Sequence, residues 1–214
     1  TTADTAALTA TTDGGSIKID TTSGNIVLGN TANADEAVYI EATKGSVTAK
    51  GAVESADTDV TVIGKDGVTL KDKVTAGTDV TVTSGAGNAT LVGAVLAETG
   101  AATVKANGTV TTSGTVQAGK SVTLTSTKGS VMTRDTVTAG TDGSIGVTAS
   151  TGISAVKALQ AGANITLQST NGNVTAGESI TATTGSVTAS TGKGEVSVQG
   201  VTAGTDISLT TDQD

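Results

Sequence analysis

Apolar side chains recur along the chain at intervals close to 21 residues, and they do so in three separate columns. The second column has steps of 21 residues except for one of 22, and the third has steps of 20 to 23. The columns are Ile26, Val47, Val68, Ala89, Val110, Val131, Ile153, Val174 and Val196; then Val53, Val74, Val95, Val116, Val137, Leu159, Ile180 and Val201; then Ile17, Val38, Val60, Val80, Ala102, Val122, Ile145, Ile165, Val187 and Ile207. Such a constant phase is typical of a protein built from stacked repeats.

Each apolar segment is short and alternates with polar residues, which is the pattern of a β-strand. In the third column the inward positions are Val60, Val62, Val80, Val82, Val122, Leu124, Ile165, Leu167, Ile207 and Leu209. The outward positions are Thr61, Thr81, Thr103, Thr123, Thr166, Thr188 and Ser208. The phrase Val-Thr-Ala-Gly-Thr-Asp recurs at Val74, Val137 and Val201, about three periods apart. Three short apolar segments in each period therefore predict three strands in each coil.

A column of glycines accompanies the apolar columns and supplies the turns. It consists of Gly24, Gly45, Gly67, Gly87, Gly108, Gly129, Gly152, Gly172 and Gly194. The alternation excludes a helical repeat, and three stacked columns in constant phase are not expected of an antiparallel sandwich. The sequence therefore predicts an all-β, three-sided parallel β-helix of about nine to ten coils, with 20–23 residues in each.

Coils spaced about 4.8 Å apart would give this solenoid a length of roughly 45 Å. No coil can bury its apolar residues alone, so stacking must create the core. We expect residues 15–214 to form the repeat domain, and residues 1–14 to be a partial coil or an N-terminal cap. The longest irregular stretches are predicted at Thr31–Ala37 and Gly85–Asn88.

The amino-acid composition excludes several classes of function. The chain has 29 Gly, no Pro, Cys, His, Phe or Trp, and a net charge of −8. Nucleic-acid binding needs clustered Lys and Arg, and the lysines here are scattered. Without cysteine there is neither a disulfide framework nor a thiolate metal site. No apolar run approaches a membrane span. The chain has neither a signal peptide nor an initiator Met, so we expect a mature product or a segment of something longer.

The coils resemble the haemagglutinin-type repeats of filamentous haemagglutinin and other two-partner-secretion exoproteins. The resemblance is carried by a short alternating strand, a Thr/Ser/Gly turn and a second strand. This pattern covers most of residues 15–210 and is clearest in Gly15–Leu28, Asp79–Leu91, Ser121–Val131 and Asn164–Val174. It is shared in part with other autotransporter passengers and solenoid adhesins.

The resemblance implies a right-handed β-helix that is secreted or displayed on the surface of a Gram-negative bacterium. It also implies an extended adhesin or the shaft of a contact-dependent toxin, exported through an outer-membrane transporter. The family's secretion domain carries an Asn-Pro-Asn-Gly motif, which this proline-free chain lacks.

The chemistry of the side chains points away from catalysis. Nucleophilic triads need a base, and the chain contains no His or Cys. We therefore expect no catalytic residues and no cofactor. β-Helix enzymes that act on polysaccharides are the enzymatic alternative, with cleavage expected to fail when Asp57 or Asp59 becomes Ala. Such sites also need clustered carboxylates and aromatic platforms, and Tyr39 is the single aromatic residue.

Acidic residues precede the strands at Asp59, Asp79 and Asp206, with a looser equivalent at Asp142. We interpret them as turn residues whose side chains bond to nearby backbone. The alternative is Ca²⁺, because stacked carboxylates repel one another and a cation would relieve that repulsion. The candidate ligands for Ca²⁺ are Asp57, Asp59 and Asp79.

Two further alternatives concern the outer surface. Ice-binding solenoids use flat Thr-x-Thr arrays, and Thr81/Thr83 and Thr123/Thr125 fit that pattern. The second column of the array is then interrupted by Ile63, Lys105 and Gln168, which favours a plain threonine ladder. Four Asn-x-Ser/Thr sequons lie at Asn88, Asn107, Asn164 and Asn173. We attribute them to chance, because the chain is rich in threonine.

The sequence thus favours a structural or adhesive module of a secreted or surface-exposed bacterial fibre. The expected partners are the continuation of a longer chain, other copies of the chain and a receptor on a host or other cell. A self-assembling subunit that polymerises end to end is the alternative, since both ends of a parallel solenoid leave open strands. The acidic Thr210–Asp214 segment is expected to be a weak cap or a truncation.

Overall fold

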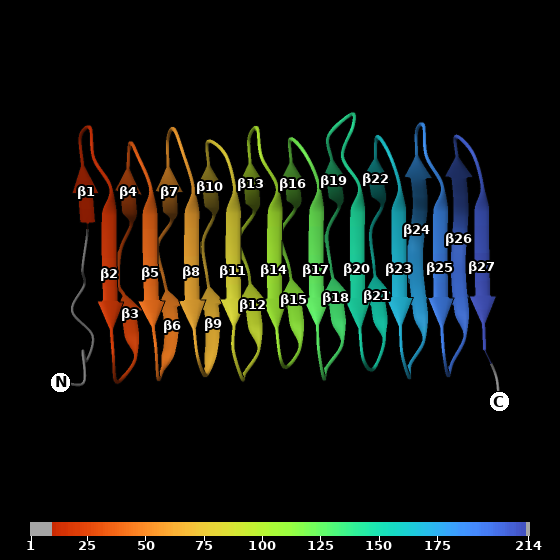
Figure 1. Cartoon of the computed structure of the whole chain (residues 1–214), viewed down its shortest axis with the longest axis horizontal. Helices are drawn as coiled ribbons and strands as arrows, with labels where there is room; N and C mark the ends of the chain where they lie inside the picture. Colours follow the sequence, from red (N-terminus) through yellow and green to blue (C-terminus); the bar gives the residue numbers. More distant parts are fainter. Residues whose placement is uncertain (1–9, 213–214) are drawn as a thin grey trace.

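The computed structural model describes residues 10–212, and every regular element in that range is a β-strand. All paired strands run parallel. Figure 1 shows the coils advancing along one axis from the N-terminal to the C-terminal end. The protein is a β-solenoid of about ten turns, as the sequence predicts.

The longest side of each coil belongs to a ten-stranded sheet that faces the viewer in Figure 1. Its strands are β2 (Ile17–Thr21), β5 (Val38–Ala42), β8 (Val60–Gly64), β11 (Val80–Ser84), β14 (Ala102–Ala106), β17 (Val122–Ser126), β20 (Ile145–Ala149), β23 (Ile165–Ser169), β25 (Val187–Thr191) and β27 (Ile207–Thr211). The first residue of every strand pairs with the first residue of the next, which confirms the third apolar column throughout.

The other two sides consist of shorter strands. The β3 side contains β3 (Ile26–Leu28), β6 (Ser46–Ala49), β9 (Gly67–Leu70), β12 (Ala89–Leu91), β15 (Val110–Thr112), β18 (Val131–Thr133) and β21 (Ile153–Ala155). The β4 side contains β1 (Ala10–Thr12), β4 (Ala32–Ala34), β7 (Val53–Ser55), β10 (Val74–Ala76), β13 (Val95–Ala97), β16 (Val116–Ala118), β19 (Val137–Ala139) and β22 (Leu159–Ala161). In the last two coils β24 (Val174–Ala182) and β26 (Val196–Ala203) run through both sides without a break.

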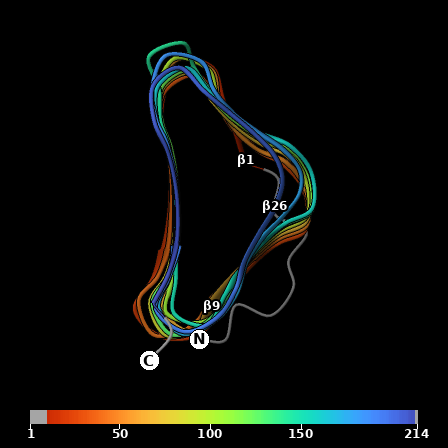
Figure 2. The ribbon, with the colours of Figure 1, turned by 90° about the vertical axis from the view of Figure 1, so that its right-hand side faces the viewer.

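Seen along its axis, the solenoid is a triangle with one long flat wall and two shorter walls (Figure 2). In Figure 1 the front strands run downward, the rear strands run upward and the coils advance to the right, so the winding is right-handed. This is the hand that strand–crossover–parallel strand connections almost always take. We call the turn into the β3 side the first edge, the turn between the two short sides the second edge, and the turn back into the ten-stranded sheet the third edge.

The core is a stack of aliphatic side chains of moderate size. Val38, Val80 and Val122 are at most 1% exposed, and Leu124, Ile165 and Leu167 are completely buried. Burying such a side chain is worth about 1.5–3 kcal/mol before chain entropy is counted. Because β-branched residues favour strands and fit a narrow interior, the core needs no aromatic residue.

Glycine is required at the first edge because successive coils approach closely there. A Cβ atom on Gly87 would lie 1.8 Å from the carbonyl oxygen of Asp66, and one on Gly45 would lie 2.0 Å from that of Gly24. Two members of the predicted glycine column are displaced by one position. Gly67 pairs with Ser46, and Gly152 precedes Ile153, the partner of Val174. The unequal steps around these glycines are the sequence signal of that shift.

Two predictions need correction. Thr31–Ala37 is not an irregular stretch, because it contains β4, whose Ala32 pairs with Val53 and extends the second column. This strand was not recognised in the sequence because it has alanine where the later strands of the column have valine, leucine or isoleucine. Ile207 and Leu209 occupy inward positions but are 51% and 45% exposed, since no described coil covers them.

The proposed N-terminal boundary is only partly visible. Ala10–Thr12 form β1 and pair with β4, so this part of the 1–14 segment already belongs to the β4 side. The rest of that segment, residues 1–9, lies outside the described residues, as do residues 213–214 at the other end.

Differences in length between coils are confined to the edges. The third edge is longest between β19 and β20, where residues 140–144 form the turn. The second edge is lost where β24 pairs with β26, and the register shifts between Ala176 and Ser179. The strand register elsewhere is unaffected by such changes, because the edges absorb the extra or missing residues.

We predict that Gly87→Ala destabilises the protein by about 1–3 kcal/mol, because the new methyl group overlaps the backbone of the neighbouring coil. The matched control is Gly146→Ala, since a Cβ atom there meets nothing within 4 Å. This control is expected to be neutral or to stabilise by about 0.4–1 kcal/mol. Chemical denaturation of both variants checks the prediction, and equal midpoints would contradict it.

Candidate functional site

Side chains at the third edge accept hydrogen bonds from the backbone of the next coil. Asp59 Oδ1 accepts from the N–H of Asp79 at 3.0 Å and from the hydroxyl of Thr78, and Asp79 Oδ1 accepts from the N–H of Ala101 at 2.6 Å. Each acceptor directly precedes a strand of the ten-stranded sheet. The geometry supports the turn interpretation of Asp59 and Asp79, because their carboxylates bind the peptide groups that enter the next strand.

Other polar residues take the same role in later coils. Ser121 Oγ accepts from the N–H of Ser144 at 3.1 Å, and Ser144 Oγ accepts from the N–H of Asn164 at 3.2 Å. Asn164 Oδ1 in turn accepts from the N–H of Ser186 at 2.8 Å. The third edge therefore carries a side-chain ladder of Asp, Ser and Asn that runs along the axis beside the backbone ladder.

Asparagine performs this function at the first edge, and sequence reasoning missed it. The Oδ1 atoms of Asn25, Asn88 and Asn173 accept from the backbone N–H groups of Ser46, Thr109 and Glu195 at 2.8, 2.8 and 3.0 Å. The available signal was position, because each of these asparagines immediately precedes an inward apolar residue. Asn88, Asn164 and Asn173, noted only as sequons, are thus structural.

The three candidate calcium ligands do not converge. Asp59 and Asp79 bind backbone N–H groups, and the N–H of Asp57 donates to the carbonyl of Asp35 at 2.8 Å. Within residues 10–212 no group of three or more acidic side chains is arranged to hold a metal ion. Calcium binding by Asp57, Asp59 and Asp79 stays a prediction without geometric support.

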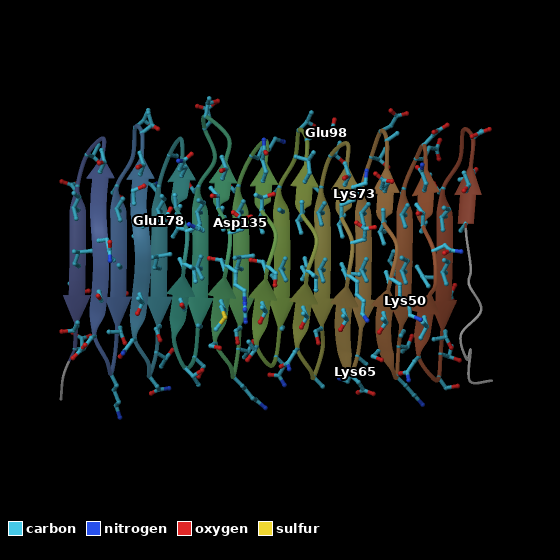
Figure 3. The ribbon with its side chains drawn as sticks, turned by 180° about the vertical axis from the view of Figure 1, so that it is seen from behind. Lys50, Lys65, Lys73, Glu98, Asp135 and Glu178 are labelled. Carbon is cyan, nitrogen blue, oxygen red and sulfur yellow. The ribbon has the colours of Figure 1, made fainter. Side chains whose placement is uncertain are left out.

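Charge is distributed unequally among the edges. In residues 10–212 the third edge carries nine acidic side chains and one lysine, Lys120, whereas the first and second edges each carry two more basic than acidic residues. In Figure 3 Glu98 lies at the third edge, Lys65 lies at the first, and Lys50, Lys73, Asp135 and Glu178 lie between them. The acids of the third edge are Asp13, Asp35, Glu36, Asp57, Asp59, Asp79, Glu98, Asp142 and Asp206.

Ion pairs connect coils near the second edge. Lys73 Nζ lies 2.5 Å from Glu54, and Lys157 Nζ lies 2.7 Å from Glu178. The hydrogen bond and the charge of Glu54 raise the pKa of Lys73, and Glu178 raises the pKa of Lys157 in the same way. Such exposed pairs contribute little stability individually, because solvent screens them.

The outer face of the ten-stranded sheet is flat and nearly uncharged over most of its length. One column contains Thr61, Thr81, Thr103, Thr123, Thr166 and Thr188, interrupted only by Gly146. The neighbouring column places Ile63 beside Thr83, Thr83 beside Lys105, and Thr148 beside Gln168. The second column is therefore irregular, as the sequence indicates, and the face is a threonine ladder.

The N-terminal end of this face differs from the rest because it holds the single aromatic residue. The Tyr39 hydroxyl donates to Glu41 at 2.5 Å, and Lys18 Nζ lies 6.0 Å from the centre of the Tyr39 ring. Lys18 also lies 3.4 Å from Asp20. The hydrogen bond to Glu41 raises the pKa of Tyr39, with burial and the nearby carboxylates acting in the same direction.

Two hollows interrupt the outer walls of the later coils. One, of about 460 Å³, lies over the β3 side where Gly152 and Ser154 leave room between Met132 and Asn173. The other, of about 410 Å³, lies over the β4 side and is lined by Thr138, Gln160 and Thr181 among others. None of the residues that line either hollow is charged.

No family model, curated protein or solved structure matches this chain. In the described residues no helix is present that is long and apolar enough to cross a membrane. The features that bear on function are therefore the solenoid itself, its edges and its outer faces.

We predict that Asp59→Ala destabilises the protein by about 1 kcal/mol, because two donors from the next coil lose their acceptor. Asp59→Asn is the control, since it removes the same negative charge but keeps a side-chain oxygen acceptor. Thermal denaturation should place the midpoint of Asp59→Asn above that of Asp59→Ala, and the reverse order would contradict a stabilising role of these hydrogen bonds.

We predict that Tyr39 ionises above its ordinary pKa of 10.0 and that Glu41→Gln lowers this pKa. Because the folded-state pKa is raised, folding favours the neutral phenol, and that contribution is lost as the pH rises through the folded-state pKa. Ultraviolet titration reports this residue alone, since the chain has one Tyr and no Trp. Asp20→Asn should lower the pKa less, because Asp20 is the weakest of the four causes.

Proposed function

We propose that the chain is a structural or adhesive module, a rigid β-solenoid shaft in a secreted or surface-exposed bacterial fibre. One observation carries this proposal: the parallel ladder is continuous from β1 to β27, and each coil is bonded to the next on all three sides. A closed stack of this kind resists bending in any direction, because bending toward one side would stretch the hydrogen bonds between coils on the opposite side. Such a module would hold a binding site at a fixed distance from an anchoring surface.

The outer faces support the adhesive part of the proposal. Long stretches of wall present threonine hydroxyl and methyl groups with little charge, and two uncharged hollows lie among them. The resemblance to haemagglutinin-type repeats supports secretion through an outer-membrane transporter. The partner would be a receptor on a host or other cell, which binds the repeated polar faces.

Two measurements on the purified chain test the proposal. Small-angle scattering and electron microscopy should show a rod of roughly 45–50 Å, as ten coils at about 4.8 Å require. Beads coated with the chain should adhere to cells more strongly than beads coated with a net-charge-matched globular protein. A compact globule refutes the shaft, and a rod without adhesion limits the proposal to a structural spacer.

A self-assembling filament subunit is a second candidate, favoured by the exposed C-terminal coil. Ile207 and Leu209 occupy core positions yet are about half exposed, and Val196, Val198 and Val201 are only partly buried. Another copy stacked on this coil would cover them and would pair the open strand edges.

Sedimentation across a range of concentrations distinguishes the two candidates. A filament subunit should assemble as concentration rises, and the double variant Ile207→Lys, Leu209→Lys should stay monomeric. Ser208→Lys with Thr210→Lys is the matched control, since these residues alternate with the inward ones in β27. A wild-type chain that remains monomeric at every concentration excludes the filament.

A further inference from the structure

Two asparagines in the chain are followed by glycine, and both lie at the first edge. Asn107–Gly108 follows β14, and Asn171–Gly172 follows β23. Asparagine followed by glycine is the dipeptide most prone to deamidation, because glycine has no side chain to obstruct attack by its own backbone nitrogen. The two sites share this dipeptide and lie at the same edge, so we expect differences in their reactivity to depend on how the coils hold them.

Asn107 is fixed by backbone hydrogen bonds on both sides of the reacting atoms. Its N–H donates to Ser84 at 3.1 Å, and its carbonyl accepts from the N–H of Lys128 at 2.8 Å. The N–H of Gly108, which must become the nucleophile, donates to the carbonyl of Gly87 at 2.9 Å. Closing a ring at Asn107 therefore requires the ladder to open locally.

Asn171 is held less firmly. Its N–H donates to the carbonyl of Ser150 at 2.8 Å, but the N–H of Gly172 reaches only the hydroxyl of Ser169, at 3.2 Å. Within residues 10–212 its carbonyl lacks the N–H donor that Lys128 supplies to Asn107. Asn171 is also exposed, whereas Asn107 is half-buried. We infer that Asn171 is a site of spontaneous deamidation in the folded protein, and that Asn107 is protected by the ladder.

The reaction balances with water as its only co-reactant. The Gly172 nitrogen loses its proton to solvent and attacks Asn171 Cγ; the Cγ–Nδ2 bond breaks, and ammonia leaves after taking up a proton. Water then opens the resulting succinimide at either carbonyl, which gives aspartate or isoaspartate at position 171. No oxidant, reductant or metal takes part, and each event adds one negative charge.

The first edge can accept the product. An isoaspartate lengthens the main chain by one methylene group, and the first edge already varies in length between coils. Val174 lies nine positions after Ile165, whereas Val68 lies eight positions after Val60. Because variation here leaves the strand register intact, the modified rod should remain folded.

Incubation of the intact chain at mildly alkaline pH tests the inference, with peptide mass mapping to locate the amide-to-acid change. Isoaspartyl methyltransferase labelling identifies the isoaspartate product. In the native state position 171 should react at least roughly tenfold faster than position 107, since opening the latter requires breaking two further backbone hydrogen bonds. In denaturant the two rates should become similar.

The variant Asn171→Gln is the matched control, because the corresponding ring would be larger and forms slowly; it should abolish the native-state reaction at this position. Equal native rates at the two sites, faster reaction at Asn107, or no reaction at Asn171 would each overturn the inference. If the deamidation rates at positions 171 and 107 differ in the native state but are similar in denaturant, the difference is caused by the folded coils.

Discussion

The axial hydrogen bonds between identical positions of successive coils are the constraint on which the rest of the structure depends. They require that residues one coil apart lie directly above one another, so a side chain suitable for one coil must suit its neighbours. This explains why aliphatic residues stack on aliphatic ones, why Gly45 lies over Gly24, and why polar acceptors lie where the next coil offers an N–H. A parallel ladder also leaves no freedom for one strand to slip without displacing its two neighbours.

The register of all three sides could be predicted from the sequence, because the apolar columns mark the first inward residue of nearly every strand. Val53 and Val74, or Val80 and Ala102, pair as their spacing indicates. The prediction failed where the apolar signal was weak. Ala32 and Ala10 continue the second column, but alanine is too small and too frequent in this chain to be distinguished from turn residues.

The edges were predicted less completely, for a physical reason. Their side-chain acceptors need only an oxygen at the correct height, so Asp59, Ser144 and Asn164 are interchangeable there. Because three residue types can occupy this position, no single residue type recurs there with the period of the coils, and the position does not stand out in the sequence. The sequence therefore left two interpretations of Asp59 and Asp79, as turn residues or as calcium ligands, and the geometry supports the first, because their carboxylates accept hydrogen bonds from backbone N–H groups.

Confining all variation in length to the edges has an evolutionary consequence. A duplication or deletion of one period, wherever it begins, adds or removes one whole coil and leaves every remaining pair of neighbours equivalent to those before. The recurrence of the same phrase at Val74, Val137 and Val201 is the trace that such copying would leave. Recombination between repeats could thus change the length of the solenoid in uniform increments, one coil at a time.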